Sequence, residues 1–150
     1  MPARARLQHI EVVANPASGS VGPDVEGQAH GIFERLGMAA NVCAPQTGDL
    51  TRCLREAIAR KPDLLVVIAG DGTARSAAEL CAEGGPMLAP LPGGTMNMLP
   101  YAIYGRRSWQ DALIDILQSG EEKPLGCGQA SGRLFLVAAI LGAPALWAPA

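Results

Sequence analysis

The chain lacks a basic excess: its 150 residues include 12 Lys and Arg against 14 Asp and Glu, for a formal net charge of -2. Without that excess a protein can displace few counterions from a phosphate backbone, so we expect no general binding of nucleic acid. Aromatic residues are also scarce, at 4% of the chain, whereas 49% of residues are hydrophobic. Aliphatic side chains must therefore build the core, and a chain of this length can bury one without disulfide or metal support.

Metal-ligating residues are also few. The chain has only two histidines, and its four cysteines stand 10, 28 and 46 positions apart, at Cys43, Cys53, Cys81 and Cys127. This spacing contains no C-x-x-C pair, so it predicts no zinc site. Because each cysteine has apolar neighbours, we expect buried, reduced thiols in a cytoplasmic protein.

Hydrophobic runs long enough for a membrane-spanning helix, about 20 residues, are missing as well. Residues 134–150 are mostly apolar, but Gly142, Pro144 and Pro149 interrupt them, and we interpret the segment as strand. The basic N-terminus, MPARARLQHIEVV, passes directly into a strand pattern and lacks the apolar segment and cleavage site of a signal peptide.

Strand and helix patterns alternate four times along the chain. Strands are predicted at residues 9–15, 40–45, 64–69 and 87–91. Helices are predicted at residues 25–36, 49–60, 74–83 and 108–119, with a short helix bent near Pro100. Alternation of this kind is typical of an α/β protein, here a three-layer α/β/α sandwich with a mainly parallel sheet joined by right-handed crossovers.

The pattern changes after residue 122. Residues 123–150 contain two strand patterns around Ser131-Gly132 with no helix between them, which predicts a β-hairpin. We therefore divide the chain into an α/β domain at 1–122 and the incomplete start of a β-rich domain at 123–150. A second strand without partners would favour a homodimer, and its apolar residues are Leu134, Phe135, Leu136, Val137 and Ile140.

Three glycine-containing loops follow strands of the predicted sheet. They are NPASGS at 15–20, GDGT at 70–73 and PGGT at 92–95. Ligands of open α/β sheets bind outside the carboxyl ends of the strands, where all three loops should lie. Glycine lets backbone N–H groups approach an anion, and the helix that follows directs its positive end toward it. The loops together predict a cradle for a polyphosphate.

Two common phosphate motifs are excluded. No G-x-x-x-x-G-K-[ST] occurs, and Gly70 and Gly72 lack the third glycine of a dinucleotide fingerprint. Asp71 would repel phosphates unless a cation lies between them or a hydroxyl donates to it, and magnesium bound to ATP supplies such a cation.

Each loop taken alone also has a structural interpretation. Asp71 could cap the helix that begins beside it, Asn97 could cap the next, and Thr95 could end a turn. Arg75 is either a phosphate contact or a solvated helix residue, and Arg106-Arg107 is interpreted as a solvated pair. The order of the three loops on successive strand ends favours the cradle.

NPASG, AGDGT and PLPGGTMN, in this order and at these separations, resemble the catalytic domain of the diacylglycerol kinase family, which includes bacterial lipid kinases and sphingosine kinases. The resemblance implies ATP-dependent phosphorylation of a lipid hydroxyl, with magnesium, by a cytoplasmic protein with peripheral contact at the inner face of the membrane. It also implies that the general base and the lipid pocket lie in a second domain, so that this chain alone turns over little lipid.

The resemblance implies one set of residues around ATP and magnesium. Asp71 would organise metal and phosphate as the catalytic and metal-binding residue. The nucleotide-binding set is Asn15, Gly19, Ala69, Gly70, Asp71, Gly72, Thr73, Arg75, Gly94, Thr95 and Asn97.

The chain departs from the family pattern at three positions. Ala69 stands where the family usually has Gly, Ser76 where it usually has Glu, and Met98 where it often has Asp. Ser76 and Met98 remove two carboxylates, which leaves a second hypothesis open: a degenerate nucleotide-binding regulatory module without lipid kinase activity. A third hypothesis is a relative of NAD kinases, which share the fold and the GDGT element.

Overall fold

A four-stranded parallel sheet forms the centre of the computed structural model, which describes residues 7–46, 48–81, 84–124, 126, 128–130 and 133–135. The strands are β1 (Ile10–Ala14), β2 (Asn41–Cys43), β3 (Leu64–Ala69) and β4 (Met87–Pro92), in the order β2-β1-β3-β4. The helices are α1 (Val25–Arg35), α2 (Leu50–Ala59), α3 (Asp71–Cys81), α4 (Met98–Tyr104) and α5 (Trp109–Ser119).

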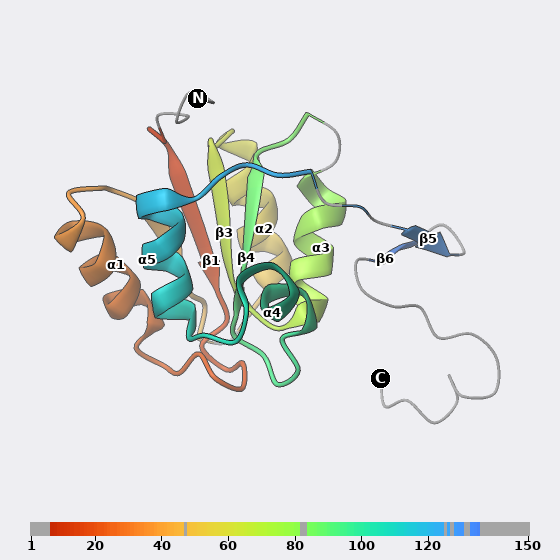
Figure 1. Ribbon diagram of the computed structural model, residues 1–150, viewed down its shortest axis with the longest axis horizontal. Coiled ribbons are helices and arrows are strands. Elements are labelled where there is room, and N and C mark those ends of the chain that lie inside the picture. The colour runs from red at the N-terminus through yellow and green to blue at the C-terminus, as the bar shows by residue number, and fades with distance from the viewer. Residues whose placement is uncertain are drawn as a thin grey trace.

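Helices cover both faces of this sheet (Figure 1). Helices α1 and α5 pack on one face, over Val12 and Ile68, while α2 and α3 pack on the other, over Val13 and Val67. All six residues of β3 are buried, as its uninterrupted apolar sequence predicts for a strand covered on both sides. The structure confirms the predicted α/β class and its parallel sheet.

Two helices differ from the sequence predictions. Helix α3 begins at Asp71 instead of residue 74, so most of the GDGT motif is helix rather than loop. Helix α4 runs through Pro100 without interruption, because Pro100 lies in its first turn, where a missing N–H costs nothing. The caps of α2 and α5 agree with prediction, since Asp49 accepts from Arg52 N and Ser108 accepts from Asp111 N.

The predicted hairpin is present as β5 (Gly128–Ala130) paired antiparallel with β6 (Arg133–Phe135). The other predicted residues of its apolar strand, Leu136, Val137 and Ile140, lie outside the described residues. Among the helices that the structure describes, none has the length and apolar character needed to cross a membrane.

The cysteine prediction is wrong for one pair. Cys43, on β2, is joined to Cys53, on α2, by a disulfide with a Cα–Cα distance of 6.3 Å. The crossover from β2 to α2 brings these residues within the separation that a disulfide spans. Cys81 is a free thiol whose pKa is raised by burial, which makes it a weak nucleophile near neutral pH. Cys127 lies outside the described residues.

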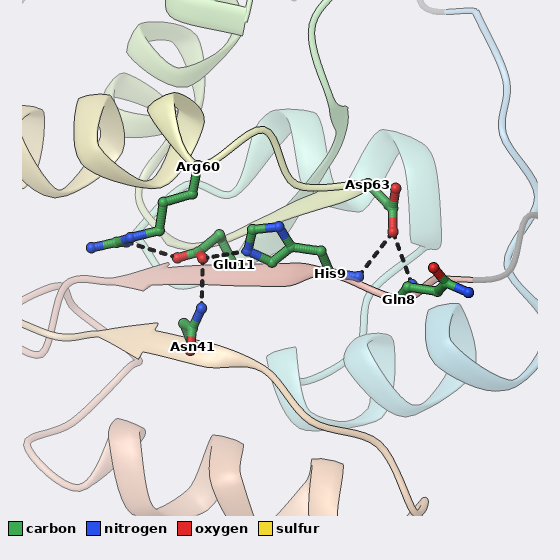
Figure 2. A network of polar contacts seen from close by, with 6 residues as sticks. All are labelled: Gln8, His9, Glu11, Asn41, Arg60 and Asp63. Atoms are coloured by element: carbon green, nitrogen blue, oxygen red, sulfur yellow. Dashed lines mark hydrogen bonds and ion pairs between the residues drawn. The ribbon is translucent and has the colours of Figure 1, made fainter.

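A buried carboxylate joins the elements at the amino end of the sheet (Figure 2). Glu11 on β1 is 2% exposed. Its carboxylate contacts His9 Nε2 at 2.8 Å, Asn41 Nδ2 at 2.7 Å and Arg60 Nη1 at 3.0 Å. His9 directly precedes β1, Asn41 begins β2 and Arg60 ends α2, so Glu11 fixes α2 and the edge strand against β1. The pattern HIEVV gave no sign of this role, because Asn41 and Arg60 are distant in sequence.

Replacing Glu11 by Ala should lower the free energy of unfolding by about 2 kcal/mol, because the Asn41 amide loses its acceptor and Arg60 its ion pair. Urea denaturation monitored by circular dichroism measures this difference. Glu56→Ala is the matched control: Glu56 is half exposed and lies 4.0 Å from Arg52, so its loss should cost less than about 0.5 kcal/mol. Equal costs for the two variants would contradict the role assigned to Glu11.

Candidate functional site

The candidate site lies where the chain leaves two neighbouring strands, β1 and β3, toward opposite faces of the sheet. These strands are neighbours, yet β1 leads to α1 on one face and β3 leads to α3 on the other. In open α/β sheets, such a switch point opens a crevice outside the carboxyl ends of the two strands, where ligands bind. The loops after β1, β3 and β4 lie together at this lower edge of the molecule in Figure 1, beside α4.

Glycine allows two of these loops to touch. A Cβ atom on Gly94 would lie 2.6 Å from the Cα of Gly70, closer than real Cβ contacts come. A Cβ on Gly19 would lie 3.3 Å from the Thr95 hydroxyl, so the loop after β1 closely approaches the same segment. The two glycines that the cradle hypothesis placed on separate loops, Gly70 and Gly94, are therefore in direct backbone contact.

Hydrogen bonds hold the three loops in this arrangement. Gly93 N donates to Ala69 O at 3.1 Å, which continues the pairing of β4 with β3. From the loop after β1, Ser20 N donates to Gly93 O at 3.3 Å and Ser20 Oγ to Gly94 O at 3.4 Å. Asn15 N donates to Ile68 O, and its side chain accepts from Ala17 N in a local turn.

The N-terminus of α3 supplies free donors at this edge. Ala74 N bonds to Gly70 O, so the preceding N–H groups, those of Asp71, Gly72 and Thr73, have no acceptor within the helix. Gly72 is exposed, and nothing lies within 4 Å of where its Cβ would be. An eleven-residue helix therefore points its positive end and open backbone toward solvent beside the loop contact.

Asp71 caps a different helix from its own. Its Oδ2 accepts from Met98 N at 3.0 Å and its Oδ1 from Leu99 N at 3.1 Å, the first two N–H groups of α4. The carboxylate thus joins the start of α3 to the start of α4 and neutralises the positive end of α4. The capping alternative for Asp71 named the wrong helix, because α4 lies 27 residues further along the chain.

No cluster of three or more potential His, Cys, Asp or Glu metal ligands occurs within the part of the chain that the structure describes. Each carboxylate oxygen of Asp71 carries a second lone pair beyond the one its backbone donor uses. A magnesium ion at this edge would therefore depend on ATP phosphates and water for most of its ligands, which is its usual manner of binding in proteins.

Asn97 closes the third loop onto itself. It is 3% exposed and adopts left-handed backbone angles, φ 52° and ψ 40°. Its side chain accepts from Gly94 N at 2.7 Å and donates to Gly94 O at 2.9 Å and to Tyr101 Oη at 3.3 Å. Asn97 precedes α4 as its N-cap residue but makes no side-chain cap bond, so it shapes the Gly94 backbone instead of capping.

Two polar residues of α3, Arg75 and Ser76, differ in whether their side chains have a hydrogen-bond partner. Arg75 is partly buried, and its Nε atom is enclosed without any hydrogen-bond partner in the described structure. An enclosed guanidinium nitrogen without an acceptor is unusual, and an anion could supply one. Ser76 instead donates to Gly72 O at 3.2 Å within its own helix.

The structure thus brings together most of the candidate site residues. Gly94 lies against Gly70, and Gly19 lies against Gly94 and Thr95, with Asn97 bonded to Gly94. Ala69 is buried behind this contact, and Asn15 lies at the end of β1. The convergence is a structural observation, and nucleotide binding by these residues remains a prediction.

The sequence profile of the diacylglycerol kinase catalytic domain matches residues 9–130. Diacylglycerol kinase of Bacillus subtilis (strain 168) is 28% identical over 137 residues, which are 87% of this chain and 44% of that protein.

Solved structures give the same result. One chain from Bacillus anthracis str. Sterne has a TM-score of 0.71 and 27% identity, and covers 89% of this chain and 47% of its own. A second structure, of a diacylglycerol kinase from that strain, has a TM-score of 0.70 and 25% identity, and the match covers 89% of this chain and 50% of the other. This chain therefore spans about half the length of the relatives it matches. It belongs to the diacylglycerol kinase catalytic domain family, a family of lipid kinases.

Proposed function

We propose that this chain is the nucleotide-binding part of an ATP-dependent kinase that phosphorylates a lipid hydroxyl. The observation that carries the proposal is the open N-terminus of α3, whose free N–H groups lie where three glycine loops converge. Membership of the family implies ATP as the nucleotide. The match to diacylglycerol kinases favours a lipid over the dinucleotide that an NAD kinase relative would use.

The residues present fit a polyphosphate. The backbone of Gly72 and Thr73 would hold phosphate oxygens, with the Thr73 and Thr95 hydroxyls as further donors. The enclosed Arg75 Nε would gain the acceptor that it lacks. Asp71, partly exposed, would direct its remaining lone pairs toward magnesium. Magnesium, when bound, would neutralise phosphate charge during transfer.

The chain itself contributes positioning. The contact between Gly70 and Gly94, together with the two hydrogen bonds between the Asn97 side chain and the Gly94 backbone, fixes the backbone that faces the phosphates before any ligand arrives. Phosphoryl transfer depends mainly on such positioning and on charge neutralisation. We propose that the group that accepts the proton of the lipid hydroxyl comes from a second domain, and that this domain brings the protein to the inner face of the membrane.

One observation favours the second candidate, a regulatory module that binds nucleotide without transfer. The Ser76 hydroxyl is bonded back to Gly72, and the Met98 side chain is 45% exposed, so neither position supplies a carboxylate. Incubation of a longer protein, in which this chain is joined to the proposed second domain, with radiolabelled ATP, magnesium and diacylglycerol in mixed micelles separates the candidates. Labelled phosphatidic acid would eliminate the regulatory module; nucleotide binding without labelled lipid would favour it.

Calorimetric titration with ATP, with and without magnesium, tests the cradle itself. We expect magnesium to tighten binding and Gly72→Val to weaken it more than about tenfold, since the added side chain would occupy the space in front of the free donors. Gly31→Val is the matched control, because Gly31 is a helical glycine of α1 with equally open surroundings. Equal affinities for the two variants would place the nucleotide elsewhere.

A further inference from the structure

A second cavity adjoins the cradle between α4 and α5. Its volume is about 340 Å³, and its lining residues are Ser20, Pro92, Tyr101, Arg106, Arg107, Ser108, Trp109 and Gln110. Ser20 also bonds to Gly94, and the Tyr101 hydroxyl contacts the Asn97 amide. Ser20 and Pro92 belong to loops of the cradle, so the cavity shares its wall with the cradle, whereas its other lining residues come from α4, α5 and the loop between them.

The N-terminus of α5 forms part of this lining. Ser108 caps the helix by accepting from Asp111 N, and Ala112 N bonds to Ser108 O. The N–H groups of Trp109 and Gln110 are left without an acceptor inside the helix. Both residues line the cavity, so an eleven-residue helix presents two free donors and its positive end there.

Trp109 adds an independent observation. Its side chain is 2% exposed, and its indole Nε1–H has no hydrogen-bond partner in the described structure. Buried indole N–H groups normally find an acceptor, because leaving one unpaired costs about 1–3 kcal/mol. An acceptor in the cavity that Trp109 lines would remove this cost.

Two arginines supply positive charge. The Arg106 guanidinium carbon lies 5.4 Å from the centre of the Tyr101 ring, and no carboxylate pairs with Arg106 among the described residues. Arg107 Nη1 contacts Asp115 at 3.3 Å, which holds its guanidinium in place while leaving other N–H groups free. Both arginines are exposed, as the sequence interpretation of a solvated pair predicts, but the sequence did not predict the cavity that they line beside α5.

We propose that this cavity binds a phosphate group, at a site separate from the ATP cradle. Free backbone N–H groups, a buried indole donor, the Ser108 hydroxyl and two guanidinium groups make a donor-rich set, and a phosphate offers the charge and the several acceptor oxygens to match it. The phosphate belongs either to a phospholipid headgroup or to a small soluble phosphate compound. Ile103 on α4, 43% exposed and close in sequence to Arg106, would face an acyl layer in the first case.

The Trp109 indole is the reporter for the test. In 15N-labelled protein carrying Trp147→Phe, the remaining indole N–H resonance belongs to Trp109. Titration with inorganic phosphate should shift this resonance saturably, and Arg106→Gln should weaken the apparent affinity about tenfold, since one charge-assisted contact is lost. Arg52→Gln, an exposed arginine of α2, is the charge-matched control and should change nothing.

Further experiments distinguish the cavity from the ATP cradle, and a lipid headgroup from a soluble phosphate compound. Gly72→Val obstructs the cradle, so the indole shift should persist in it, and Arg106→Gln should bind Mg-ATP as tightly as the unmodified protein. A lipid headgroup is assigned if the protein sediments with vesicles of phosphatidylcholine and phosphatidylglycerol in equal parts but not with vesicles of phosphatidylcholine alone. The Arg106→Gln variant should then fail to sediment with the mixed vesicles. A phosphate shift without vesicle binding assigns a soluble phosphate compound. No indole shift, or a shift unaffected by Arg106→Gln, overturns the proposal.

Discussion

Protein carrying Gly94→Ala should bind no detectable Mg-ATP and should lose about 3 kcal/mol of unfolding free energy, at the upper end of the usual cost of overpacking. The added Cβ would lie 2.6 Å from Gly70 Cα, and the atom it meets is backbone at the end of β3. No side chain can rotate away to relieve the contact, so the loop after β4 must move away from the loop after β3. Separation of these loops removes the surface on which we place the phosphates.

Calorimetric titration and urea denaturation of the same preparation measure both effects. Gly31→Ala is the matched control: it adds the same methyl group within α1, where nothing lies within 4 Å, and should stabilise the protein by about 0.5–1 kcal/mol. If Gly94→Ala bound Mg-ATP with unchanged affinity, the contact between the loops would have no role in nucleotide binding.

The sequence predicted the elements whose evidence is local. The apolar sequence of β3 gave its bounds, and the spacing of Val25, Ala29 and Phe33 gave the buried face of α1. Glycines followed three strands, and parallel strands end at one edge, so the convergence of the loops could be predicted without coordinates. The sequence-based fold class and family were confirmed for the same reason.

Pairings between distant residues could not be predicted. Both backbone donors of Asp71, and the Asn41 and Arg60 partners of Glu11, lie 27 to 49 positions away, and no local pattern encodes those partners. The bond between Cys43 and Cys53 depends on how α2 packs beside β2. The cavity at Trp109 depends on how α4 and α5 are oriented relative to each other, which could not be predicted from the sequence. Strand ends could be placed from sequence, whereas the atoms that each polar side chain contacts could not.

These pairings make α4 the link between the two proposed sites. Asp71 and Asn97 fix its start from the side of the cradle, and Tyr101, one turn further, lines the phosphate cavity. A change at the start of α4 should therefore reach both sites, whereas a change at Arg106 should reach only the cavity. This asymmetry is the reason that Arg106→Gln is the informative variant for the cavity.

Replacement of Asp71 should show whether its carboxylate serves α4 alone or also magnesium. Asp71→Ala leaves the N–H groups of Met98 and Leu99 without acceptors and should cost about 3 kcal/mol of stability. Asp71→Asn keeps one carbonyl acceptor and should cost about half of that. Asp49→Asn is the matched control, since Asn caps α2 as well as Asp does and stability should barely change.

The magnesium dependence of ATP affinity separates the two roles of Asp71. If the carboxylate contacts magnesium, Asp71→Asn should lose part of the ATP affinity that the metal adds, because the variant has lost a ligand of the metal. If the carboxylate only caps α4, the variant should bind ATP more weakly in both conditions and keep the full effect of magnesium. We expect the first result, since the two backbone donors occupy one lone pair on each oxygen and Asp71 remains partly exposed at the edge where the free N–H groups of α3 lie.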